Sequence, residues 1–304
     1  MIYLPIAEMP VNVLLLLLVS GMVGFVSGMV GVGGGFIMTP SLIFLGVPAP
    51  VAVATGASQI AATSFSGIMT QTRRKAVDWR MGILLSVGGV GGSASGVWLF
   101  EKLLRLGQLD LIISILYLLL LSGVGSLMLW ESYSVWRGRR SAGVSVLRRP
   151  LKTIAHRLPF RMRFPRSGLY ISVIPPLLIG FGIGALSAIM GIGGGFIVIP
   201  AMIYLLRMPT NVVIGTSLFQ VLVVASLIVV MQSAATQTVD LVLAAVLMLG
   251  GVIGAQFGAR IGAGMKSEHL RAILGALLMA ASIKFLLDIV IPPIEPYVLG
   301  GGLL

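Results

Sequence analysis

The chain has 304 residues, of which 57% are hydrophobic and only 10% are charged, and its formal net charge is +12. Soluble domains carry about 25% charged residues, so this composition excludes a soluble globular protein and predicts a polytopic all-α membrane protein. The absence of cysteine excludes disulfides and thiolate chemistry.

Apolar segments follow one another along the chain. Residues 1–10 carry no Lys or Arg, which argues against a cleaved signal peptide, so the first segment is expected to stay in the membrane. Most segments have the ~20 residues that a helix needs to cross the hydrocarbon core. Two are short and start at glycine clusters. Each could be a half-helix, a re-entrant segment or a helix that crosses a strongly thinned part of the bilayer. In chain order the predicted segments are 11–30, 34–45, 51–70, 81–100, 109–130, 169–190, 194–206, 211–232, 239–259 and 269–291.

The two apolar halves share a sequence block. Residues 27–40 (SGMVGVGGGFIMTP) return 160 positions later as 187–200 (SAIMGIGGGFIVIP), with eight of 14 positions identical. Further matches follow at offsets of 160 to 162, among them Thr55 with Thr216 and Asp78 with Asp240. We therefore expect two repeats of about five apolar segments each, with short or broken helices at the glycines. The predicted division is 1–130 for the first repeat, 131–168 for a linker and 169–304 for the second repeat.

Basic residues predict the orientation of these segments. Ten of the 21 Lys and Arg residues lie in 137–166, a stretch without Asp or Glu, and the positive-inside rule places it in the cytoplasm. Counting crossings from there puts 18 of the 21 basic residues inside and both termini outside a cell (inner) membrane. An odd number of segments per half makes the repeat inverted. The basic stretch also suits anionic lipid headgroups, whereas nucleic acid binding is not expected.

Glycines of the duplicated block are the first candidates for a substrate site. A glycine triplet disfavours continuous helix, and a helix that restarts after it directs N–H groups and the positive end of its dipole at the break, which suits an anion. The alternative is that these glycines only allow helices to pack closely or bend. A dinucleotide fingerprint would need a βαβ unit, which is not predicted. The candidates are Gly31, Gly33, Gly34, Gly35, Gly191, Gly193, Gly194 and Gly195.

Polar residues after each block form the second candidate set. Thr55 and Gln59 share one helix face at i and i+4, as do Thr216 and Gln220. These side chains can donate to an oxyanion without adding a fixed charge, although hydrogen bonding between helices is an equally good interpretation. The full set is Thr55, Ser58, Gln59, Thr216, Ser217 and Gln220.

Asp78 and Asp240 occupy matched positions just before apolar runs. The simpler interpretation is that each caps the N-terminus of a helix near the membrane surface, and the alternative is a role in proton or ion coupling. Apart from His269 at the first position of the last segment, the apolar segments contain no histidine, and they contain no cysteine or carboxylate pair. We therefore expect no catalytic residues, no metal site and no cofactor, so that the protein is not predicted to be an enzyme.

The duplicated G-x-G-G-G-F-x-x-x-P block, the A-T-x-x-x-Q and G-T-x-x-x-Q that follow it, and the V-D before a glycine-rich helix resemble the TauE/SafE family of sulfite exporters. This resemblance covers both apolar halves and implies a cytoplasmic-membrane transporter that moves small sulfur-containing anions, such as sulfite or organosulfonates, outward. We expect a secondary carrier in which the glycine breaks and the Thr/Gln faces line one site with alternating access.

Other functions remain open at this point. The same scaffold could carry another small anion, such as a carboxylate, or could be a non-transporting membrane scaffold or lipid-binding protein. The expected partners are a small anionic substrate and membrane lipid, and a homo-oligomer is possible.

Overall fold

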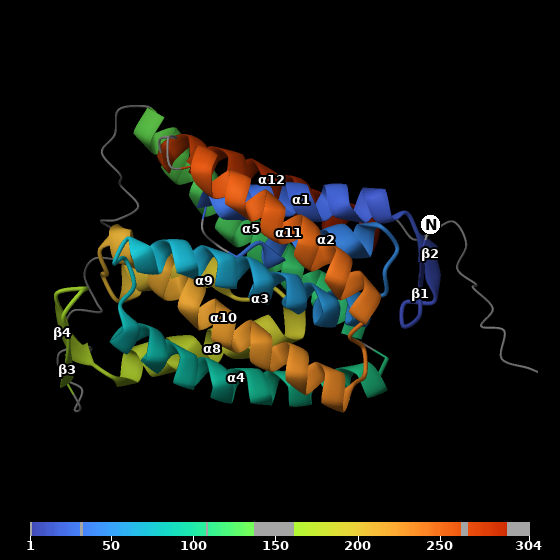
Figure 1. Ribbon diagram of the computed structural model, residues 1–304, viewed down its shortest axis with the longest axis horizontal. Helices are drawn as coiled ribbons and strands as arrows, with labels where there is room; N and C mark the ends of the chain where they lie inside the picture. Colours follow the sequence, from blue (N-terminus) through green and yellow to red (C-terminus); the bar gives the residue numbers. More distant parts are fainter. Residues whose placement is uncertain (1, 31–32, 108, 137–160, 263–266, 291–304) are drawn as a thin grey trace, which may run out of the picture.

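The computed structural model describes residues 2–30, 33–107, 109–136, 161–262 and 267–290 (Figure 1). Its regular structure is almost entirely helical, as expected for an all-α membrane protein. The helices are α1 (Val13–Val30), α2 (Gly35–Phe44), α3 (Ala49–Arg73), α4 (Trp79–Arg105), α5 (Leu109–Trp136), α8 (Ile174–Met190), α9 (Gly195–Pro200) with the π-helix η1 (Ala201–Leu205), α10 (Thr210–Ala235), α11 (Leu241–Gly262) and α12 (Ser267–Val290).

Each predicted apolar segment corresponds to a helix in this set, so the chain is confirmed as an all-α membrane protein. In the described ranges, four helical stretches are both long and apolar enough to cross a bilayer by themselves. They are Trp79–Arg105, Leu111–Trp130, Val212–Ala235 and Leu241–Ile261.

The two short segments turn back instead of crossing. Helix α2 has 10 residues, which span ~15 Å, whereas the hydrocarbon core is ~30 Å thick. Leu42 near the end of α2 and Val47 just after it pack in one cluster with Leu4, which precedes α1. Helix α2 therefore returns to the face where α1 begins, and the two form a helical hairpin with the glycine break at its tip. Helices α8 and α9–η1 do the same, because Leu206 and Met208 pack with Phe164.

Two short β-hairpins precede the helical hairpins and were not predicted. Strand β1 (Ile2–Leu4) pairs with β2 (Met9–Val11), and β3 (Arg161–Phe164) pairs with β4 (Leu169–Ser172), both antiparallel. They lie at opposite ends of the molecule (Figure 1).

The ends of the predicted linker 131–168 carry regular structure. Helix α5 extends to Trp136 and β3 starts at Arg161. Residues 137–160 lie outside the described residues.

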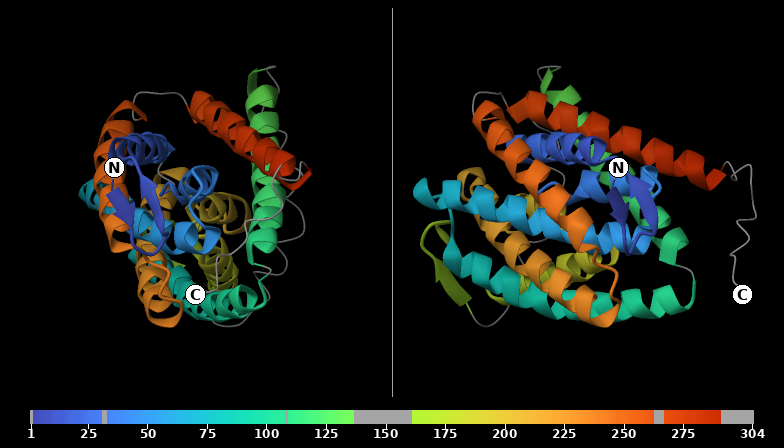
Figure 2. Two further views of the ribbon diagram at one scale, coloured as in Figure 1. Left: turned by 90° about the vertical axis from the view of Figure 1, so that its right-hand side faces the viewer. Right: turned by 45° about the vertical axis from the view of Figure 1, so that its right-hand side comes forward.

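Helices of the two halves pack reciprocally. Helix α1 runs along α11 and α4 runs along α8, while α3 packs on α10 in the middle and α5 on α12 (Figure 2). Glycines allow this close approach, since a Cβ at Gly24 of α1 would overlap the backbone of Gly251 in α11. The matched glycines behave alike, because a Cβ at Gly184 of α8 would overlap the backbone of Gly89 in α4. Small residues at helix interfaces are what membrane bundles use to bring backbones together.

Candidate functional site

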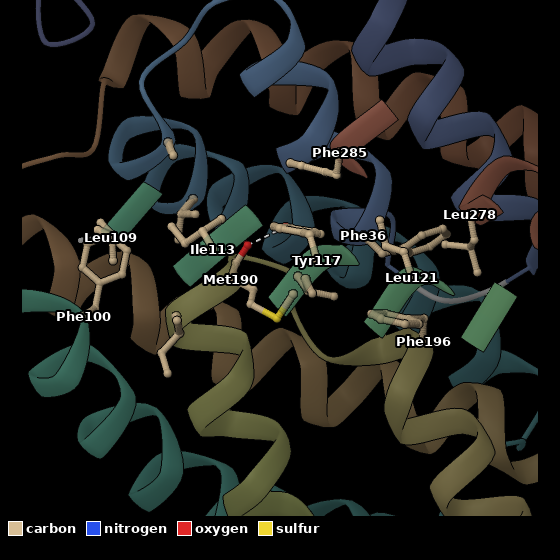
Figure 3. Close-up of a cluster of buried hydrophobic side chains, with 14 residues drawn as sticks. Phe36, Phe100, Leu109, Ile113, Tyr117, Leu121, Met190, Phe196, Leu278 and Phe285 are labelled. Atoms are coloured by element: carbon tan, nitrogen blue, oxygen red, sulfur yellow. Dashed lines mark hydrogen bonds between the residues drawn. The ribbon is translucent and has the colours of Figure 1, made fainter. Parts of the chain in front are cut away.

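The tips of the two helical hairpins meet inside the bundle. The first break separates α1 from α2 and the second separates α8 from α9, which confirms the predicted interruptions. A Cβ at Gly35 would overlap the backbone of Ile192, so the two tips touch through glycine. The matched phenylalanines of the duplicated block, Phe36 and Phe196, also contact each other, with ring centroids 5.4 Å apart. Both rings belong to the buried cluster drawn in Figure 3.

The glycines at the breaks adopt conformations that other residues rarely take. The φ angles are +90° at Gly33, +79° at Gly34, +70° at Gly193 and +71° at Gly194. Gly34 and Gly194 are the residues immediately before α2 and α9. The positive end of the α2 dipole therefore lies at the tip, where negative charge is stabilised. Gly31, also a candidate, lies outside the described residues.

A small apolar group contacts both breaks. Ile60 of α3 and Val221 of α10 are fully buried and cluster with Ala225. A Cβ at either Gly33 or Gly193 would meet both Ile60 and Val221. These two residues thus contact both tips, and they occupy matched positions directly after Gln59 and Gln220.

A cavity of about 640 Å³ reaches the first break from one face of the molecule. We call this the basic face, because Arg73, Arg74 and Arg260 line the cavity there. Gly33 and Thr63 line it as well, and the Thr63 hydroxyl donates to the Gly33 carbonyl at 3.2 Å. The volume falls within the range of small-molecule sites. The other lining residues are Ser27, Gly28, Met29, Ser66, Gly67, Met69, Thr70, Gln71, Ile214, Leu218, Ala255, Gln256 and Ala259.

The charge of this cavity favours anions. Of its described lining residues, three are arginines and none is acidic. A cleft with charge of one sign and low-dielectric walls concentrates ions of the opposite sign. Within the described ranges, no group of three or more His, Cys, Asp or Glu residues could hold a metal ion. The cavity therefore offers hydroxyl and guanidinium groups to its ligand, and Gly33, two residues before α2, borders it.

The second break is held by side chains from the first half. The Tyr117 hydroxyl donates to the Met190 carbonyl at 2.6 Å (Figure 3). The Thr39 hydroxyl donates to the Gly191 carbonyl at 3.1 Å. These bonds satisfy carbonyl groups at the C-terminus of α8 that have no partner within the helix. The second break is therefore closed in this conformation, whereas the first borders the cavity.

Comparison with known proteins agrees with this architecture. Residues 16–285 match the family described as Sulfite exporter TauE/SafE. The chain belongs to the TauE/SafE family. Its curated relatives include a probable membrane transporter protein of Xylella fastidiosa, 31% identical over 87% of this chain and 91% of the relative. The probable membrane transporter protein YunE of Bacillus subtilis is 26% identical over 87% of this chain and 94% of the relative. No solved structure matches significantly. The protein is thus a TauE/SafE membrane transporter.

The predicted Thr/Gln set lies away from the cavity of this TauE/SafE protein. None of its six residues is part of the cavity lining. The Thr55 hydroxyl accepts from the Asp240 N–H and the Thr216 hydroxyl from the Asp78 N–H, each at 3.0 Å. Ser58 is buried, and the Ser217 hydroxyl donates to the Ile214 carbonyl.

The two glutamines lie against glycines of the matched helices. Gln59 packs on Gly251 and donates to the Ser20 carbonyl at 3.3 Å. Gln220 packs near Gly89, and both of its buried amide atoms lack a hydrogen-bond partner. A substrate role for either glutamine stays a prediction.

Both candidate aspartates cap helices. Asp78 accepts from the Met81 N–H at the start of α4, and Asp240 accepts from the Leu243 N–H at the start of α11. Each also holds the β-hairpin that precedes the other half. Asp78 Oδ2 accepts from the N–H and hydroxyl of Ser167, and Asp240 Oδ2 accepts from the Ile6 N–H. A coupling role for these carboxylates stays a prediction.

We expect Asp78→Asn to lower the thermal stability of the detergent-purified protein. The substitution places an amide NH₂ among buried donors, and leaving a buried group unsatisfied costs about 1–3 kcal/mol. Asp240→Asn should do the same, because its contacts correspond. Thermal unfolding followed by tryptophan fluorescence measures the effect. Lost proton dependence of transport at unchanged melting temperature would contradict the capping interpretation and favour coupling.

Sequence reasoning missed several residues at the site. Ser27 opens the duplicated block and Thr63 lies four residues after Gln59, but neither was among the candidates. The arginines that line the cavity were used only to predict which ends of the segments face the cytoplasm. The available signal for the apolar group that contacts both breaks was its matched position. Ile60 directly follows Gln59, as Val221 directly follows Gln220.

Proposed function

We propose that this membrane transporter is a secondary carrier that exports a small sulfur-containing anion, such as sulfite or a sulfonate, by alternating access between two inverted repeats. The observation that carries the proposal is the cavity from the basic face to Gly33, whose described lining includes three arginines and no acidic residue. An anion would enter past Arg73, Arg74 and Arg260 and reach the hydroxyl groups and helix N-terminus at the first break.

The reciprocal packing supports the inverted repeat. Helix α1 pairs with α11 as α8 pairs with α4, which is the exchange expected when matched helices are related by a pseudo-two-fold axis. The β-hairpins support the same relation, since they precede matched helices and lie at opposite ends of the bundle (Figure 1). Transporters built in this way place the substrate where their broken helices meet.

Sulfur chemistry is supported by the family description and by the donors at the site. A sulfonate or sulfite presents several oxygen acceptors on one small group, and guanidinium and hydroxyl groups are the donors that suit them. Carriers of small carboxylates would use similar donors, so substrate competition separates the two classes.

Purified protein in liposomes should accumulate or release radiolabelled sulfite or a sulfonate faster than protein-free liposomes. Unlabelled sulfonates should compete, and acetate or lactate should not. Competition by carboxylates alone would assign the carrier to another anion class. Absence of flux for every small anion, from protein that remains monodisperse, would support a non-transporting membrane scaffold.

A further inference from the structure

The face opposite the cavity is closed by apolar side chains. At this end of the bundle, beyond Ile60 and Val221, α3, α4, α8 and α10 bring together a buried cluster that we call the opposite-face cluster. Its members are Ala57, Val97, Ala188, Val224 and Ile228, with the partly buried Met231 packed against them; the partly buried Val229 packs there too.

Every buried member of this cluster, and Met231 with them, has a sequence counterpart in the cavity, whereas Val229 corresponds to Ile68, which is outside the cavity lining. The offsets of 160 to 162 that align the two halves relate the six residues, in the order given above, to six residues that all line the cavity. These are Leu218, Ala259, Gly28, Thr63, Gly67 and Thr70. The same set of positions is therefore packed shut at the opposite face and lines the cavity at the basic face.

A pair of matched glutamines shows the same asymmetry. Gln232 is fully buried, and its Nε2 donates to the Ala188 carbonyl at 3.0 Å. Its counterpart Gln71 lines the cavity. The counterpart of Ala188 is Gly28, which lines the cavity too. On the closed side, the hydrogen bond from Gln232 therefore joins α10 to α8. On the basic face, the corresponding residues Gln71 and Gly28 line the open cavity.

We infer that the opposite-face cluster is a closed gate. When the protein changes to its second conformation, the six cavity residues form the corresponding gate on the basic face. In that second conformation Gln71 donates to the Gly28 carbonyl and Gln232 releases Ala188. The inference rests on the proposed transport function and adds to it the residues that close each side.

The two gates differ in strength. Val224, Ile228, Met231 and Val97 stand where the basic face has Thr63, Gly67, Thr70 and Ala259. Closing the basic-face gate buries less apolar surface at these four positions and also buries the exposed Thr70 hydroxyl, both of which disfavour closure. The protein therefore rests with its cavity open to the basic face, which is the predicted cytoplasmic side and the side from which an exporter loads.

Thiol labelling tests the gates directly, because the chain has no native cysteine. Ala259→Cys and Val97→Cys are matched reporters, one in the cavity and one in the opposite-face cluster. In nanodiscs, a water-soluble maleimide should label the Val97→Cys protein at least tenfold more slowly than the Ala259→Cys protein. Equal rates would overturn the closed gate.

A second substitution in the Val97→Cys protein then separates a change of gate from a local loss of packing around position 97. Added to Val97→Cys, Gln232→Ala should raise the labelling rate about tenfold, and Gln71→Ala should lower it. Thr70→Met copies Met231 onto the weaker gate, so it should also raise labelling at position 97 from the other side of the bundle. Both cavity substitutions change exposed or half-buried side chains, so the fold should tolerate them.

The combination of outcomes decides the matter. If Gln232→Ala raises labelling while Gln71→Ala and Thr70→Met leave the rate at position 97 unchanged, the cluster is ordinary packing and the inference is wrong. Labelling needs no substrate, so a failed flux assay would count against the transport proposal, whereas unresponsive labelling would count against the gates alone.

Discussion

Valine in place of Gly34 or Gly194 is expected to reduce transport at least 100-fold while the protein still inserts into the membrane. Both glycines have positive φ, at +79° and +71°, a region that costs an ordinary residue about 1–2 kcal/mol and a β-branched residue more. A Cβ at Gly34 would also lie 2.9 Å from the Ser27 Cβ, and one at Gly194 would overlap Ile183 Cγ2. The tips must shift, and the anion donors shift with them.

A matched control separates backbone strain from site geometry. Gly107 has a similar φ of +67°, but nothing lies within 4 Å of a Cβ placed there. Gly107→Val should therefore transport nearly as well as the wild type. Initial rates of anion uptake, normalised to protein recovered in the liposomes, provide the comparison. Transport that survives both tip substitutions would show that the glycine breaks are not part of the substrate path.

Local signals in the sequence were sufficient for the helices and their interruptions. The length of each apolar segment predicted a helix, because the thickness of the hydrocarbon core sets how many residues a crossing helix needs. The glycine triplets gave the breaks, because positive φ at Gly33, Gly34, Gly193 and Gly194 is a property of the residue itself. The direction of α2 after its break was left open, since it depends on packing of Leu42 and Val47 against Leu4.

The roles of the polar residues could not be predicted from spacing. Thr55 and Gln59 share one helix face, which left a substrate role and hydrogen bonding between helices equally open; the Thr55 hydroxyl accepts from the Asp240 N–H, 185 residues away. The β-hairpins were missed because their strands have only three or four residues, too few for a periodic pattern. Leu4-Pro5 and Phe164-Pro165 do share the offset of the glycine block, which was the available signal.

Removing the arginines of the cavity is expected to weaken substrate capture at the basic face. The variant Arg73→Gln, Arg74→Gln, Arg260→Gln should raise KM at least tenfold at low ionic strength and leave kcat nearly unchanged. Clefts with charge of one sign raise association rates by about 10- to 1000-fold through the concentration of counter-ions. Added salt should raise the wild-type KM towards that of the variant, because the Debye length falls from about 30 Å at 0.01 M to about 8 Å at 0.15 M.

Arg105→Gln is the control, since Arg105 is an exposed arginine that pairs with Glu101 and lies outside the cavity. Initial uptake rates over a range of substrate concentrations, with substrate on the basic face, give KM and kcat for each protein. A KM that rises equally in the control would assign the effect to overall charge. A kcat that falls with KM unchanged would place these arginines in the conformational change, because loss of charge at an entrance affects capture and leaves later steps intact.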